Sequence, residues 1–239
     1  MAAKKQSTGE ASLVDTKSVS ATVDALGALS FTGEKLAPSA AKSAAQWLAG
    51  RQGLPGAYAN MFAGFTSEYQ AGIVVFTGER ILSASARHIL GEEACRALRL
   101  LAVRDAGVQS AIERACEGMA GCLKRDADGT RNTNPGRYCC GKCTVGLWRN
   151  LLAGSFDRRE ERLRKGVSHL RTLHNDAGQW QGMPFWYTVL ALEEMPFPEA
   201  KRELEYAAPV LERAAARAPA KAKYAARRQQ LAARALSRL

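Results

Sequence analysis

The sequence predicts an all-α protein built from helical hairpins. Segments rich in Ala, Leu, Arg and Glu, which have high helix propensity, recur along most of the chain. One segment, 185–192, is apolar on every side and follows Pro184, as expected for a helix buried all round. The segment before it, 158–165, is highly charged and amphipathic, so we expect it to lie outside the apolar one. This pairing of an outer with an inner helix favours a ring or solenoid of helical hairpins.

The expected elements follow in chain order. Residues 1–38 mix Ser, Thr, Gly and Lys with few large apolar residues, which predicts a flexible lead. Residues 39–212 form the expected helical domain, with long helices over 40–51, 92–105, 108–124, 157–175 and 199–217 and shorter apolar helices over 67–77, 143–153 and 185–194. The run 73–76 is rich in β-branched residues, but it is short and no partner strand or hairpin turn is evident.

Size and composition exclude several classes of protein. A chain of 239 residues can bury one core, and 46% hydrophobic with 24% charged residues excludes a disordered or fibrous chain. No apolar run approaches the roughly 18 residues that suggest a membrane span. The first residues carry no apolar run typical of a secretory signal peptide. We therefore expect a cytoplasmic protein with no membrane span.

The net charge of +11 is concentrated at the C-terminus. Residues 213–239 hold eight basic residues and no acidic one, and their Ala, Arg, Lys and Gln content predicts a basic helical tail over 220–237. Such a tail could contact nucleic acid or an acidic protein, or it could be a solvated terminal helix. The candidate contact residues are Lys221, Lys223, Arg227, Arg228 and Arg234.

Two segments of the chain repeat at the same spacing. In the first, Leu48 is followed by Gln52, Gly56 and Tyr58. In the second, Leu170 is followed by His174, Gly178 and Trp180, with Lys165-Gly166 ahead of it as Lys42 is ahead of the first. A degenerate middle copy runs from Arg114 to Trp148. Glycine allows a tight exit from a helix, and the aromatic ring then covers the end of the hairpin.

This pattern resembles the QW repeat of squalene/hopene cyclases and the related repeat of protein prenyltransferase β subunits. The resemblance implies a partial α/α toroid, or half-barrel, of about three to four helical hairpins with an extra C-terminal basic helix. It implies a divergent transferase-like or cyclase-like protein that binds a mostly apolar small molecule or a peptide in a concave cavity. The alternative is a non-catalytic helical scaffold whose basic tail binds a partner. So short a ring leaves an open face, which an extra helix or a second subunit would cover.

The most specific local motif is the cysteine cluster 138–143, in which Cys139, Cys140 and Cys143 enter a helix from a loop. The Cys140-x-x-Cys143 spacing suits metal chelation or redox chemistry, and a helix N-terminus lowers a thiol pKa. Zinc would need further ligands, for which the candidates are Cys139, Cys122, Cys116, His169 and His174. A dithiol switch would need only two thiols, and packed free cysteines are the third interpretation. His88 stands alone on a helical stretch and is expected to be structural.

The resemblance also points to candidate residues on the inner helices. In prenyltransferases a Cys and a His at the starts of inner helices hold zinc. Cys143 falls at a similar place to that Cys, but Tyr187 stands where the His is expected, so that family's zinc site is not expected here. The Asp-rich motif of the cyclases is incomplete at 126–129. Glu68 could act as a general acid in the cavity, or cap a helix, or pair with Arg80. The expected catalytic residues are Glu68, Cys143 and Tyr187, and the expected cavity lining is Ser67, Tyr69, Thr144, Trp148 and Trp186.

Overall fold

The computed structural model describes residues 13–129, 134–154 and 158–239, apart from the side chains of 125–129, and it is mostly helical. The all-α prediction is therefore confirmed. The helices are α1 (Val19–Thr32), α2 (Pro38–Ala49), α3 (Thr66–Ala71), α4 (Ser85–Leu101), α5 (Ala106–Gly129), α6 (Gly141–Ala153), α7 (Arg159–Leu170), α8 (Phe185–Glu194), α9 (Pro198–Ala215) and α10 (Lys223–Leu236).

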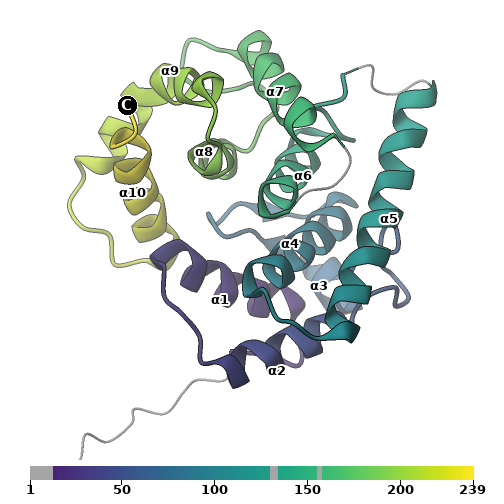
Figure 1. Cartoon of the computed structure of the whole chain (residues 1–239). Helices are drawn as coiled ribbons and strands as arrows, with labels where there is room; N and C mark the ends of the chain where they lie inside the picture. The colour runs from purple at the N-terminus through teal and green to yellow at the C-terminus, as the bar shows by residue number, and fades with distance from the viewer. Residues whose placement is uncertain (1–12, 130–133, 155–157) are drawn as a thin grey trace, which may run out of the picture.

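Helices α4, α6 and α8 lie at the middle of the molecule, and α2, α5, α7 and α9 lie outside them (Figure 1). The central helix α6 is buried continuously from Cys143 to Leu151, because α4, α7 and α8 pack against different sides of it. The outer helix α7 instead buries one face, which contains Leu163, Val167 and Leu170. Helix α8 is buried from Tyr187 to Leu192, so the predicted buried apolar helix after an amphipathic helix is confirmed.

Close contact between α6 and its neighbours depends on two helical glycines. A Cβ at Gly166 of α7 would lie 2.6 Å from the ring of Trp148. A Cβ at Gly146 of α6 would lie 2.2 Å from Glu92 Oε2 on α4. Both separations are far inside van der Waals contact, so only glycine lets these helices approach so closely.

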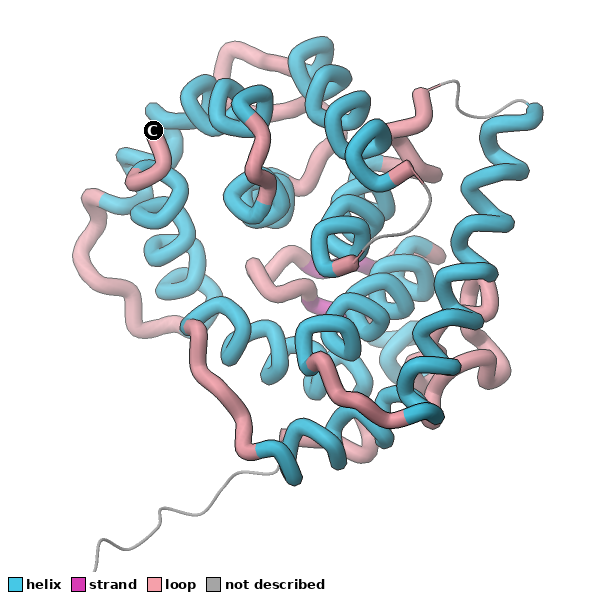
Figure 2. Tube along the Cα trace, viewed as in Figure 1, coloured by secondary structure: helices cyan, strands magenta, loops and turns pink. Residues whose placement is uncertain are grey.

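The helix predicted over 67–77 is shorter than expected, and the sequence analysis missed a small hairpin. Helix α3 ends at Ala71, and β1 (Ile73–Val74) pairs antiparallel with β2 (Arg80–Ile81) in the register Ile73 to Ile81 (Figure 2). Gly78 has a φ of 89°, a left-handed conformation that lets the chain reverse between the strands. The hairpin was missed because β2 has only two residues and carries no β pattern of its own.

The expected flexible lead is wrong for residues 13–38. They contain α1, capped by the Ser18 side chain, which accepts a hydrogen bond from the amide of Ala21. Val19, Thr22 and Leu26 are buried, and α1 packs against α4. Residues 1–12 lie outside the described residues. The sequence signal was weak because α1 is rich in small residues and lacks a regular apolar stripe.

The basic C-terminal segment is an integral part of the helical body. Helix α9 runs through the expected boundary at residue 212, and α10 packs against α9 and α8 through Leu231, Ala232 and Ala235. It also reaches α1, where Arg227 pairs with Asp24. The first and last described helices are therefore side by side (Figure 1). Within the described part of the chain, no helix has the length and apolarity needed to cross a membrane.

Candidate metal centre

The first turns of α4 and α6 and the loop before α6 bring three potential metal donors together. Ligand atoms of His88, Cys139 and Cys143 all lie within 4.8 Å of one another. The Cys143 sulfur is 3.3 Å from Nδ1 of His88 and 3.6 Å from the Cys140 sulfur. Cys140 in turn lies 3.3 Å from the hydroxyl of Ser85. The predicted cysteine cluster therefore exists as a cluster in space, and His88 joins it.

The local backbone explains how the cysteines are presented. Cys140 is the N-cap of α6 and has an extended conformation, with φ −150° and ψ 174°. Cys139 consequently stays in the loop and is exposed, whereas Cys143 lies in the first helical turn and is buried. The site thus combines one exposed, one half-buried and one buried sulfur.

Aromatic residues hold His88 in place. Its imidazole stacks on the ring of Tyr58, with ring centroids 3.6 Å apart, and Tyr138 lies at 5.6 Å. The Tyr138 hydroxyl donates a hydrogen bond to that of Tyr58. Tyr58 is the aromatic residue that closes the first sequence repeat, so the repeat positions a donor of the candidate site.

The thiols have strongly different proton affinities. Hydrogen bonds between Cys140 and the Cys143 thiol and the Ser85 hydroxyl, together with backbone amides at the α6 N-terminus, lower the pKa of Cys140 to about 4 against the effect of burial. The hydrogen bond to Cys140 and burial raise the pKa of Cys143 well above its usual range. The pair therefore carries one thiolate and one thiol at neutral pH.

A buried carboxyl group lies one helical turn beyond His88. Glu92 is fully buried, and neither of its carboxylate oxygens has a hydrogen-bond partner among the described residues. Burial, and after it the charges of Glu93 and Cys140, raise the pKa of Glu92 well above its ordinary value. Glu92 is not one of the three grouped ligands, but its carboxyl is close enough to affect the proton affinities of the Cys140 and Cys143 thiols.

The other predicted zinc ligands do not join this cluster. Cys116 lies beside Arg99, 2.7 Å from its Nη2, and Cys122 is buried on α5. His169 contacts Thr172, and His174 lies 2.7 Å from Glu203. Sequence reasoning missed His88 because no spacing links it to residues 139–143. The one available signal was that His88 and Glu92 share a helix face at a separation of four residues.

Glu68 does not face this centre. Its carboxylate accepts hydrogen bonds from Ser18 Oγ at 2.8 Å, from Ser20 N at 2.7 Å and from Phe65 N at 2.8 Å. It therefore ties the start of α1 to the start of α3, which corresponds to the capping interpretation of this residue. Of its two neighbours in the sequence, Ser67 is exposed to solvent. The hydroxyl of Tyr69 accepts a hydrogen bond from the backbone amide of Gly64.

The remaining predicted residues lie in two regions, because Thr144 and Trp148 both line a small pocket beside α7 whereas Trp186 and Tyr187 lie on α8. Thr144 and Trp148 are buried on α6, where the Trp148 indole donates to the carbonyl of Gly136 at 2.8 Å. Trp186 is half-buried and packs edge-on against Phe185. Tyr187 is fully buried and donates its hydroxyl proton to Glu93.

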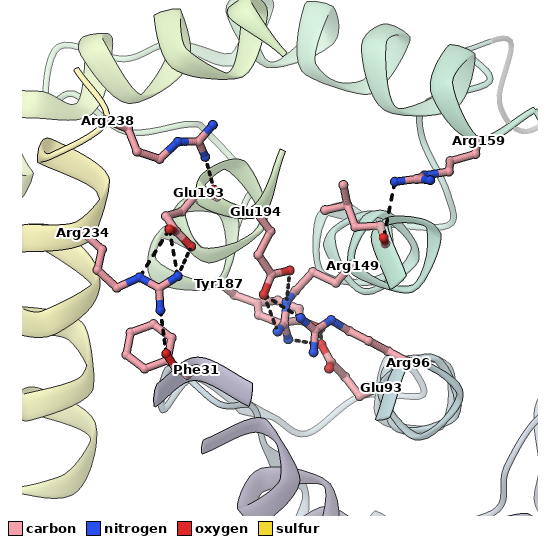
Figure 3. A network of polar contacts seen from close by, with 11 residues as sticks. Phe31, Glu93, Arg96, Arg149, Arg159, Tyr187, Glu193, Glu194, Arg234 and Arg238 are labelled. Carbon is pink, nitrogen blue, oxygen red and sulfur yellow. Dashed lines mark hydrogen bonds and ion pairs between the residues drawn. The ribbon is translucent and has the colours of Figure 1, made fainter. Parts of the chain in front are cut away.

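Tyr187 instead belongs to an ionic network at the centre of the helices (Figure 3). Arg149 pairs with Glu93 and Glu194, and Arg96 lies 2.7 Å from Glu194. Although burial alone would raise it, the pKa of Glu194 is lowered by Arg149 and Arg96. Glu194 is therefore held in its charged form inside the protein by two arginines.

Most of the predicted tail contacts are directed inward. Lys223 and Arg227 pair with Asp24, and Arg234 pairs with Glu193. Arg228 donates to the carbonyl of Thr77, whereas Lys221 is exposed. These contacts account for how α10 is docked on the helical body.

Comparison with protein-family models, with curated proteins and with solved structures finds no match to this chain. The resemblance to cyclases and prenyltransferases therefore depends on the repeat alone.

Proposed function

We propose that the protein holds a zinc ion through His88, Cys139 and Cys143. The proposal is carried by the convergence of these three donors within 4.8 Å. Thiolate sulfur and imidazole nitrogen are the donors that zinc prefers, and zinc sites with three protein ligands keep a fourth position open. Cys139 is exposed, so the open position would be accessible from solvent. Such a metal supplies Lewis-acid activation of a bound water, thiol or carbonyl.

The proposed activity is that of a divergent transferase-like or cyclase-like enzyme acting on a mostly apolar small molecule or a peptide. Support comes from the contacts between outer and inner helices, since α2 packs against α4, α7 against α6 and α9 against α8. These contacts are compatible with a small α/α toroid of about three to four hairpins. The equivalent repeat residues also act alike, because Gln52 bonds Arg114 of the following outer helix and His174 bonds Glu203 of α9.

Elemental analysis of the purified protein tests the metal. We expect about one equivalent of zinc per chain, and we expect His88→Ala, Cys139→Ser and Cys143→Ser each to reduce it. Cys122→Ser is the matched control, since Cys122 lies on α5 outside the cluster, and its zinc content should not change. Cobalt substitution should add thiolate-to-metal absorption that the three ligand variants lack. A protein that takes up neither zinc nor cobalt would refute the proposal.

A dithiol function is the second candidate, favoured by the 3.6 Å between the sulfurs of Cys140 and Cys143. Oxidised glutathione would accept two electrons and two protons as the two thiols form a disulfide. If this is the function, peptide mapping will show a reversible Cys140–Cys143 disulfide in metal-free protein. Failure of Cys140→Ser to prevent the disulfide would contradict this assignment.

A further inference from the structure

A second site lies between α1 and the C-terminal half of α4, away from the cysteine cluster. It is a pocket of about 330 Å³, near the lower end of the range for small-molecule sites. Its walls are mostly apolar, formed by Val23, Leu26, Leu36, Ala97, Leu100 and Leu101. Leu100 is 44% exposed although it is a large apolar residue, so the mouth of the pocket presents apolar surface to solvent.

Ser30, Glu34, Lys35 and Glu93 also line the pocket, and Arg96 is the buried charged residue among its lining. Arg96 is only 8% exposed, and its Nη2 donates to Glu194. Its Nε is buried and has no hydrogen-bond partner among the described residues. Arg96 also borders a smaller cavity of about 130 Å³ together with Arg149, Glu194 and Arg234. A buried guanidinium that keeps an unused donor next to a cavity calls for an acceptor inside that cavity.

The neighbouring carboxylates are engaged by other partners. Glu93 accepts hydrogen bonds from Arg149 and from Tyr187, and Glu194 accepts from Arg149 and through one nitrogen from Arg96 (Figure 3). Neither of these two carboxylates takes the Nε proton of Arg96. An acceptor bound in the pocket would complete this group.

We propose that this pocket binds a small amphipathic molecule with a single anionic head. The head, a carboxylate or a phosphate, would accept the Nε–H of Arg96. The apolar tail would lie along Leu26, Ala97 and Leu100 towards the mouth. An uncharged alcohol could use the same walls but would gain less from the guanidinium, because charge-assisted hydrogen bonds are the stronger ones. The pocket lining includes none of the proposed zinc ligands, so this site can be tested without reference to the metal.

Calorimetric titration with decanoate, decyl phosphate and decan-1-ol tests the proposal on the full chain. We expect at least one of the anionic probes to bind at least ~10-fold more tightly than the alcohol. The better of the two anions identifies the head group. In Arg96→Gln this preference should disappear while the alcohol binds as before. Arg104→Gln is the matched control, since Arg104 is exposed beyond the end of α4 and should leave all three affinities unchanged.

A second variant covers the case in which Arg96→Gln fails to fold. Leu100→Asp changes an exposed residue at the mouth, adds a negative charge and removes apolar surface. It should weaken the anionic probes by ~10-fold or more while leaving thermal unfolding nearly unchanged. Equal affinities for decan-1-ol and decanoate, or unaltered anion binding in Leu100→Asp, would overturn the proposal.

Discussion

The sulfur of Cys143 lies 3.3 Å from Nδ1 of His88, although the two residues are separated by 55 positions in the chain. This contact exists because α4 and α6 pack along much of their lengths and start at the same end of the pair. The proposed metal centre is thus a consequence of helix packing, and residues that fix His88 should matter as much as the ligands.

Tyr58 should support zinc binding without touching the metal. Its ring stacks on His88 at 3.6 Å and fixes the imidazole plane. We expect Tyr58→Leu to lower zinc affinity by about 10-fold or more, in the range found for residues that orient metal ligands. Competition with a chelator measures this. Tyr58→Phe keeps the ring and loses the hydrogen bond from Tyr138, so its affinity should stay near that of the unaltered protein.

Glu92 should make the metal-free protein less stable as the pH rises. Burial raises its pKa in the fold well above 4.5, so the folded protein holds this proton more tightly than the unfolded chain does. The contribution of Glu92 to the free energy of unfolding is therefore fully present below the unfolded pKa and is lost as the pH rises towards the folded pKa. We expect Glu92→Gln to increase the free energy of unfolding at about pH 8 by about 1 kcal/mol or more, and to have a smaller effect at about pH 5. Urea unfolding at the two pH values measures it. The exposed Glu205→Gln should show no such pH dependence.

Gly166 should be intolerant of a side chain. A Cβ there would lie 2.6 Å from the buried Trp148 ring, which the surrounding core holds in place. We expect Gly166→Ala to destabilise the protein by about 1–3 kcal/mol, despite the better helix propensity of Ala. Gly107→Ala, in the exposed first turn of α5, should change the stability little. Thermal unfolding measures both changes in stability. If Gly166→Ala and Gly107→Ala lowered the stability equally, the close packing at Gly166 would be wrong.

The contact between α10 and α1 should contribute measurably to stability. Arg227 pairs with Asp24 at 2.5 Å, both side chains are 12% exposed, and the guanidinium also covers the Phe76 ring at 4.0 Å. We expect Arg227→Ala to cost about 1–3 kcal/mol, because a mostly buried carboxylate would lose a close partner. A double-mutant cycle with Asp24→Ala would measure the coupling. Arg213→Ala, at an exposed position of α9, should have an effect below about 0.5 kcal/mol.

Several features were accessible from the sequence because they depend on local pattern. The Ala, Leu, Arg and Glu segments became helices close to the expected ranges, and the apolar segment 185–192 became buried helix α8. The run 138–143 placed three thiols at the start of a helix without any knowledge of tertiary contacts. By contrast, α1 was missed because its stability comes from Glu68 and α4, which lie far away in the sequence.

The sequence by itself determined the helical class, the alternation of outer and inner helices and the thiol cluster, since propensity, periodicity and spacing are properties of neighbouring residues. Only the tertiary structure decided that His88 completes the cluster, that Glu92 is buried beside it and that Arg96 borders a pocket with an unused donor. It also decided that the basic C-terminal helix is docked against Asp24 and Glu193. These relationships arise where helices distant in the chain pack together, and no local pattern encodes which faces will meet.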